Sequence, residues 1–142
     1  KTYHHRAQEI SLLRTPVEDS FLAYSASGRY EAQTKNPVFL ELVSSLSDFA
    51  QTRKETLGLV RFFTIRPRGM VYKHSDEKSV YQHGQRFHLI VDARPGNTMF
   101  VGTDHTDVRP GQIWQYDNSV EHRSYNFSDA RRINVIFETH QV

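Results

Sequence analysis

Hydrophobic positions follow a helical period in the first part of the chain and a strand period in the rest. The first helical signal is Thr15-Pro16-Val17-Glu18, which has the residue order of a helix N-terminus: a capping threonine, a proline in the first turn and a glutamate three residues after the cap. Gly28 is a residue type that commonly ends a helix. The pattern therefore predicts a first helix between these residues.

A second helix is predicted to begin at Asn36-Pro37. The apolar residues that follow recur every three or four positions, which is the spacing of one helix face: Val38, Leu42, Leu46, Phe49 and Ala50. The charged cluster Arg53-Lys54-Glu55 ends the pattern. We expect the apolar stripe to pack on the rest of the protein.

From Leu57 onward, short runs of β-branched and aromatic residues predict strands. These runs are Leu59 to Ile65, Gln85 to Ala93, Thr98 to Gly102, Gln112 to Tyr116 and Arg132 to Glu138. Turn residues lie between them at Pro67-Arg68-Gly69, Pro95-Gly96-Asn97 and Pro110-Gly111. The order predicts an α+β fold, in which a helical N-terminal part of about residues 1–56 packs on a β core of about residues 57–140.

Composition and charge are those of a single globular domain, residues 1–142. The chain is 37% hydrophobic and 24% charged, and no apolar run approaches the ~20 residues of a membrane span. Its formal net charge is +2 and its basic residues are scattered, so we expect neither a membrane nor a nucleic-acid partner. Without cysteine there are no disulfides, which fits a reducing compartment, and we expect a cytoplasmic protein. The chain begins at Lys1 rather than at Met, so processing could have removed preceding residues.

His74-Ser75-Asp76 and the distant His122 are candidate metal ligands. In an extended segment, residues two apart point the same way, so His74 and Asp76 can bind one ion from a single strand end. Two imidazoles and one carboxylate form the ligand set of non-haem Fe(II) oxygenases, in which one face of the metal stays open. A structural zinc site would call for four ligands, usually with thiolates, and this chain has no cysteine to supply them.

Two of the predicted strands alternate between an apolar face and a face that carries cations. The cationic faces hold Arg86, His88 and Ile90 in one strand and Arg132, Asn134 and Ile136 in the other. Such a mixed face is suited to a small carboxylate, because an arginine binds a carboxylate through two parallel charge-assisted hydrogen bonds. The same alternation directs Arg131 to the outside.

The order of these residues resembles the aspartyl/asparaginyl β-hydroxylase family of Fe(II)/2-oxoglutarate dioxygenases, and most closely its bacterial branch that includes proline cis-hydroxylases. The resemblance runs from about Val60 to Glu138 and rests on His74-x-Asp76, Arg86-x-His88, Gly111, Asp117, His122 and Arg132. It implies a double-stranded β-helix core. It also implies that His74, Asp76 and His122 hold Fe(II), that Arg132 binds the distal carboxylate of 2-oxoglutarate, and that Arg86 and His88 complete the cosubstrate site.

The reaction implied by the resemblance couples the decarboxylation of 2-oxoglutarate by O₂ to the hydroxylation of a substrate C–H bond. Vertebrate members that act on epidermal growth factor-like domains lack the carboxylate ligand that Asp76 supplies here, so their substrate cannot be carried over. The short chain offers no recognisable docking domain for a large protein. We therefore expect a small polar substrate, such as a free amino acid, and the sequence leaves the oligomeric state open.

Two other functions are compatible with the sequence. Gly111, Ser119, His122 and Asn126 resemble part of the second cupin motif, which would fit a metal-dependent isomerase or a dioxygenase that does not use 2-oxoglutarate. A non-catalytic member that binds a small acid is the other possibility. Asp117 and Asn126 fit a role in turns as well as a substrate contact. Iron-dependent consumption of 2-oxoglutarate would distinguish the first function from both alternatives.

Overall fold

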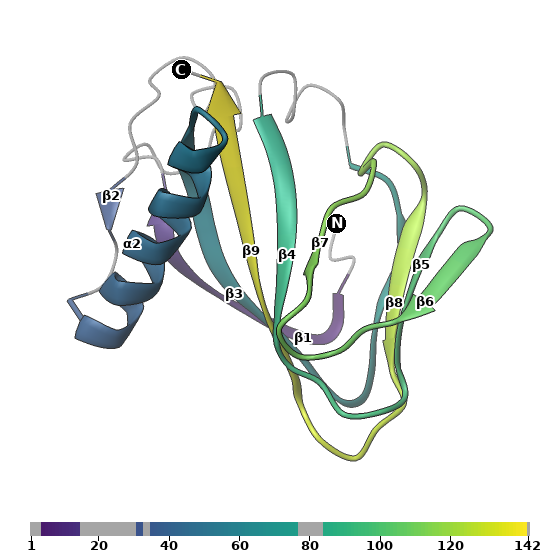
Figure 1. Ribbon diagram of the computed structural model, residues 1–142. Coiled ribbons are helices and arrows are strands. Elements are labelled where there is room, and N and C mark those ends of the chain that lie inside the picture. Colours follow the sequence, from purple (N-terminus) through teal and green to yellow (C-terminus); the bar gives the residue numbers. More distant parts are fainter. Residues whose placement is uncertain (1–3, 15–30, 33–34, 77–83, 142) are drawn as a thin grey trace.

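The computed structural model describes residues 4–14, 31–32, 35–76 and 84–141 (Figure 1). The first predicted helix, from Thr15 to Gly28, lies outside these residues. The described elements are β1 (His4–Arg14), β2 (Glu31–Ala32), α2 (Pro37–Thr52), β3 (Glu55–His74), β4 (Gly84–Asp92), β5 (Asn97–Val101), β6 (Asp104–Asp107), β7 (Ile113–Trp114), β8 (His122–Asn126) and β9 (Arg132–Gln141). Within the described part of the chain, no helix is both long enough and apolar enough to span a bilayer.

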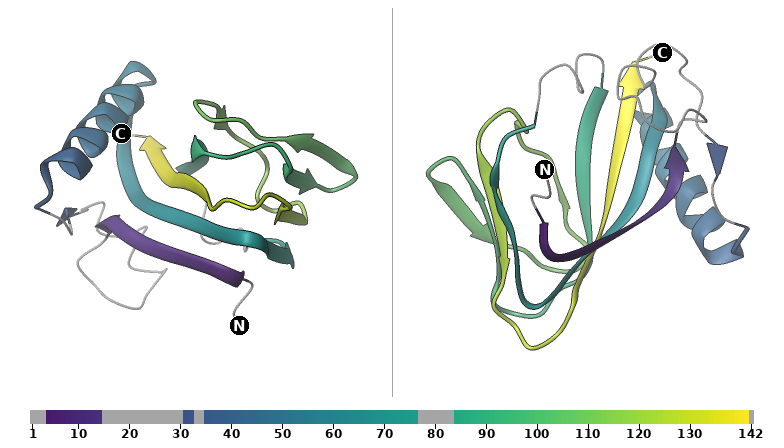
Figure 2. Two further views of the ribbon diagram at one scale, coloured as in Figure 1. Left: turned by 90° about the horizontal axis from the view of Figure 1, so that it is seen from below. Right: turned by 180° about the vertical axis from the view of Figure 1, so that it is seen from behind.

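The strands form one curled antiparallel sheet in the order β6-β5-β8-β3-β9-β4-β7, and β1 adds to β3. The long strand β3 belongs to both halves of this sheet. Its first part pairs with β9 from Glu55 to Ile65, and its last part pairs with β8 from Met70 to His74. Figures 1 and 2 show the two halves inclined toward each other, with β3, β9 and β4 on one side and β8, β5 and β6 on the other. The fold is a double-stranded β-helix with a helix packed on it, as the sequence predicts.

β3 changes its partner at Pro67-Arg68-Gly69, where the sequence predicts a turn. The strand does not end there, so this prediction is wrong, but the backbone is distorted: Arg68 has a φ of 59°. A side chain at Gly69 would bring a Cβ within 2.8 Å of the Arg66 carbonyl oxygen. The predicted turn residues thus bend one continuous strand from one half of the sheet into the other.

Helix α2 begins and ends as its sequence predicts. The Asn36 side chain accepts a hydrogen bond of 3.0 Å from the Val38 amide, and Pro37 occupies the first turn. After Thr52 the chain leaves the helix through Lys54, whose φ is 58°. The helix therefore occupies the range that capping signals define.

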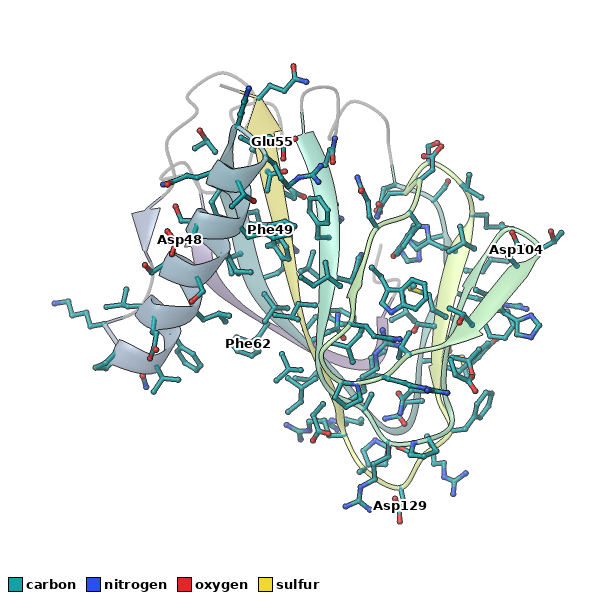
Figure 3. All side chains as sticks on the ribbon, in the orientation of Figure 1. Asp48, Phe49, Glu55, Phe62, Asp104 and Asp129 are labelled. Carbon is teal, nitrogen blue, oxygen red and sulfur yellow. The ribbon has the colours of Figure 1, made fainter. Side chains whose placement is uncertain are left out.

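One face of α2 packs on the outer face of β3, β9 and β4. This core cluster contains Leu46, Ala50, Leu57, Val60, Phe87, Val135 and Phe137, with Leu42 and Phe49 against it. Phe49 points from the helix toward the sheet (Figure 3) and meets the rings of Phe87 and Phe137 edge to face, at centroid distances of 5.5 and 5.6 Å. Val38 is 69% exposed, so its predicted place in the buried stripe is wrong. Its neighbour Phe39, in the same first turn, packs against this core instead.

Four further described strands were not predicted, among them the two-residue strand β2. Residues 4–14 form β1 on the edge of β3, so the expected helical N-terminal part is wrong for this segment. β6 and β8 are the remaining two. The five predicted runs overlap β3, β4, β5, β7 and β9, and the turns at Pro95-Gly96 and Pro110-Gly111 are present.

Candidate metal centre

The three predicted metal ligands meet where β3 ends beside the start of β8. His74 and His122 are direct partners across these two strands, and their ring centroids lie 4.3 Å apart. Asp76 follows two residues after His74. Its Oδ1 lies 3.8 Å from Nε2 of His74 and its Oδ2 lies 3.9 Å from Nε2 of His122. One ligand atom from each of the three residues lies within 4.8 Å of the others, which is close enough to hold one metal ion.

Both histidines have the ring orientation of a metal ligand. Nδ1 of His74 lies 2.6 Å from the Tyr72 carbonyl oxygen, and Nδ1 of His122 lies 2.8 Å from the Val120 carbonyl oxygen. Since a carbonyl can only accept, each Nδ1 donates, which puts the lone pair of each ring on Nε2, the atom that would bind an ion. Burial lowers the pKa of His122, against a smaller opposing effect of the Val120 contact, so this imidazole is neutral at neutral pH. The donor set therefore fits a divalent cation such as Fe(II).

The third candidate ligand, Asp76, is held by two side chains. Asn118 donates a hydrogen bond of 3.0 Å to Oδ2, and the Arg86 guanidinium donates a second bond of 3.3 Å to the same oxygen. The Asp76 amide also donates to the Asn118 carbonyl at 2.9 Å. Arg86 in turn donates from Nε to Oε1 of Glu138 at 2.8 Å, and its Nη2 contacts the same oxygen. Arg86 is thus shared between two carboxylates.

A second group of polar residues lies on the inner face of β4, β8 and β9. Arg132 is 2% exposed and donates from Nη1 to the Ser124 hydroxyl. Burial lowers the pKa of Arg132 to about 10, although the nearby Tyr116 raises it, so the guanidinium stays charged at neutral pH. This places a buried positive charge inside the same curled sheet as the candidate metal ligands.

His88, Tyr116 and His122 form a connected series of ring contacts that leads to the candidate metal ligands. The rings of His88 and Tyr116 stack at a centroid distance of 5.0 Å, and Tyr116 meets the His122 ring at 5.1 Å. Burial, with the charges of Arg86 and Arg132, holds the pKa of His88 well below its usual range. Burial and the Asp76 charge raise the pKa of Tyr116. Both rings are therefore neutral at neutral pH.

Several buried polar atoms on this inner face have no hydrogen-bond partner among the described residues. They are Nε2 of His88, Nε of Arg132, Oδ1 of Asn134 and Oε2 of Glu138. Buried polar groups in folded proteins are nearly always paired. A polar ligand bound inside the sheet would supply the missing partners.

The chain matches the model of a protein family described as Aspartyl/Asparaginyl beta-hydroxylase over residues 18–141, which is most of its length. The chain belongs to the aspartyl/asparaginyl β-hydroxylase family. Since this is a family of hydroxylases, the match supports an enzyme. No curated protein matches the sequence.

Solved structures similar to this family member include several double-stranded β-helix proteins. A predicted oxalate decarboxylase from Thermotoga maritima is 14% identical, with 68% of this chain and 75% of that chain covered and a TM-score of 0.47. A cupin-2 domain protein from Rhodospirillum rubrum is 15% identical, with coverages of 58% and 49% and a TM-score of 0.45. A protein with a double-stranded β-helix domain from Klebsiella pneumoniae subsp. pneumoniae is 15% identical, with coverages of 61% and 75% and a TM-score of 0.45.

The structure also places the other polar residues that the sequence analysis singled out in this hydroxylase-family chain. The Asn126 amide donates to the carbonyls of Ile65, Arg66 and Ala130, so it holds the bend of β3 against the loop before β9. The Asp117 carboxylate accepts from the amide and hydroxyl of Ser119 within a turn. Arg131 is exposed on the outside, as strand alternation predicts.

Sequence reasoning missed three residues of the site. Ser124 could have been found, because it is two residues after His122 and so shares its face of β8. Asn118 and Glu138 carry no local signal, since their contacts with Asp76 and Arg86 join residues 42 and 52 positions apart.

Proposed function

We propose that this chain is an Fe(II)/2-oxoglutarate-dependent hydroxylase of a small polar substrate, such as an amino acid. The observation that carries the proposal is the combination of two features inside one curled sheet. His74, Asp76 and His122 form a cluster able to hold one ion. Arg132 adds a buried guanidinium whose Nε has no partner among the described residues.

In this proposal the triad residues bind Fe(II) through the two Nε2 atoms and the Asp76 carboxylate. Bound together, Fe(II), 2-oxoglutarate and O₂ supply the oxidising power needed to hydroxylate an unactivated C–H bond. The chain contributes the binding and the orientation. The carbonyls of Tyr72 and Val120 fix the two imidazole rings, so the ligand atoms are in place before the ion arrives.

Arg132 would bind the distal carboxylate of 2-oxoglutarate. The Ser124 hydroxyl fixes one side of its guanidinium, and the pairing of Ile65 with Arg132 fixes the backbone beneath it. A charged donor that is buried and already oriented loses little freedom when the anion binds. Burial of this charge without a carboxylate is costly, which supports an anionic ligand as its partner.

We expect the neutral His88 ring to lie beside the bound 2-oxoglutarate. Its neutral ring stacks on Tyr116 and can offer Nε2 to a polar atom of the cosubstrate. Apolar residues complete the inner wall next to these rings: Ile90, Met99, Val101, Val108 and Trp114. Such a wall excludes water from the reacting atoms.

The alternative of a cupin-type enzyme that does not use 2-oxoglutarate would keep the same triad. It gives no role to a buried, charged Arg132, whereas 2-oxoglutarate has a second carboxylate to place there. The partner atoms that Arg132 lacks among the described residues therefore favour the first function.

The experiment is an assay of the purified protein with Fe(II), 2-oxoglutarate and O₂ against a panel of free amino acids and short peptides. We expect one panel member to stimulate succinate formation and to gain a single oxygen atom by mass spectrometry. Omission of Fe(II) should abolish both signals. A substrate that is converted equally well without 2-oxoglutarate would support the cupin-type alternative instead.

A further inference from the structure

Asp76 has its two carboxylate oxygens in different environments. Oδ2 accepts hydrogen bonds from Nδ2 of Asn118 at 3.0 Å and from Nη1 of Arg86 at 3.3 Å. A carboxylate oxygen has two lone-pair directions, and these two donors occupy both. Oδ1 is the oxygen nearer to Nε2 of His74, at 3.8 Å. If Asp76 binds an ion, the available oxygen is Oδ1.

Arg86 alone would be an unsuitable partner for a metal ligand. A guanidinium forms a strong bidentate pair with a carboxylate, and such a pair would compete with the metal for both oxygens of Asp76. In the structure Nε and Nη2 of Arg86 are both directed to Oε1 of Glu138, and Nη1 donates to Asp76. Glu138 therefore occupies one bidentate side of the guanidinium, with two of its five N–H donors.

The electrostatics of Glu138 bear on the same contact. Burial raises the pKa of Glu138 to about 8, whereas the Arg86 guanidinium against Oε1 favours the charged carboxylate, the form that holds Arg86 most strongly. The pair is firmly placed, because Arg86 on β4 and Glu138 on β9 are direct partners across the two strands. Glu138 is 2% exposed, and a buried carboxyl group of this kind is costly unless its hydrogen bonds are made.

We infer that Glu138, Arg86 and Asn118 are positioning residues for Asp76, and that Glu138 acts through Arg86 to keep Oδ1 of Asp76 free for the metal. This inference rests on the proposed function in one respect, the metal at His74, Asp76 and His122. It gives Arg86 a contact with a metal ligand, and the expected contact of Arg86 with 2-oxoglutarate stays a prediction. Side chains around a metal ligand change metal affinity by 10–100-fold when they are removed.

The test uses Co(II), whose absorption spectrum reports its coordination, in the wild type and in Glu138→Gln. The substitution keeps the side-chain size and leaves no carboxylate, so the hold on Arg86 weakens and Arg86 can turn more of its fork toward Asp76. We expect the affinity for Co(II), measured by titration, to fall at least about tenfold, with a changed visible spectrum. A purely structural role of Glu138 would lower the unfolding temperature and leave the spectrum of the bound ion unchanged.

Glu55→Gln is the matched control. Glu55 is also a buried carboxylate that accepts from an arginine, Nε of Arg53 at 3.1 Å, and from the Thr139 hydroxyl. Thr139 follows Glu138 in β9, so its side chain points to the opposite face, toward α2 rather than toward the metal ligands. Figure 3 shows Glu55 near the C-terminal end of β9. We expect Glu55→Gln to leave Co(II) affinity and spectrum as in the wild type.

Asn118→Ala is the second variant and provides a result even where Glu138→Gln does not fold. It removes the other donor to Oδ2 and should also weaken Co(II) binding by about tenfold. Wild-type affinity and spectrum in both variants, or in Asn118→Ala when Glu138→Gln does not fold, would overturn the inference while leaving the proposed function intact. A wild-type protein that binds neither Co(II) nor Fe(II) would overturn the proposed function itself.

Discussion

Arg131 and Arg132 are adjacent residues of the same type, one exposed and one buried, so their alanine variants make a matched pair. Arg132→Ala should raise the 2-oxoglutarate concentration needed for half-maximal turnover at least tenfold, since a bidentate carboxylate contact contributes more than about 1.4 kcal/mol. Arg131→Ala should change it little, because Arg131 is exposed. Titration of 2-oxoglutarate in the succinate assay measures both. The opposite ranking would remove Arg132 from the cosubstrate site.

The buried imidazole of His88 should make the protein less stable in acid. Its pKa is well below the unfolded value of 6.5, chiefly through burial. Below pH 6.5 this histidine becomes protonated in the unfolded chain but stays neutral in the folded chain. The free energy of unfolding therefore falls as the pH falls, by at most about 1.4 kcal/mol per pH unit. His88→Gln should remove this part of the loss. Urea unfolding of the wild type and His88→Gln at pH 7.5 and 5.5 measures how much free energy of unfolding each protein loses. Equal losses in the two proteins would contradict a buried, neutral His88.

Individual residues of the site differ in how far the sequence predicts them. His74 ends β3 and Asp76 follows two residues later, so local geometry alone places them together. Arg132 and His88 follow from strand alternation. Glu138 and Asn118 do not, because their importance depends on contacts with Arg86 and Asp76 that exist only after the strands pair.

At the scale of the element, α2 should stabilise the fold through one face only. Leu46 is 4% exposed within the core cluster under the helix, so Leu46→Ala should lower the free energy of unfolding by about 2–5 kcal/mol. Val38→Ala in the same helix should change it by less than about 0.5 kcal/mol, since Val38 is 69% exposed. Urea denaturation measures both variants. Equal effects would mean that the helix is not anchored through Leu46.

Strand β8 shows why some elements escaped prediction. Its inner face carries His122, Ser124 and Asn126, which are polar because they serve the site and the bend of β3. Strand prediction depends on an apolar inner face, and β8 lacks one. β6 has only the polar residues Asp104 to Asp107 and lies on an edge. β1 forms by pairing with β3, a long-range contact that no local pattern records.

At the scale of the whole molecule, the curling of the sheet lets residues of both halves contribute to one site. The candidate ligands His74 and His122 belong to the half that contains β8, and Arg86 reaches Asp76 from β4 in the other half. Arg132 of β9 contacts Ser124 of β8 in the same way. The polar contacts of the site therefore also join the two halves of the fold.

Metal binding should consequently stabilise the entire domain. At a Co(II) concentration 100 times the dissociation constant, a single site adds about 2.7 kcal/mol to the free energy of unfolding. For a chain of 142 residues this corresponds to a rise in unfolding temperature of roughly 5–10 °C. His122→Ala should lose this rise, because only two of the three ligands remain. Its metal-free unfolding temperature should stay near that of the wild type, since the large apolar clusters are built from other side chains. Thermal unfolding of the wild type and His122→Ala, each with and without Co(II), measures this rise. A full rise in unfolding temperature retained in His122→Ala would place the metal elsewhere.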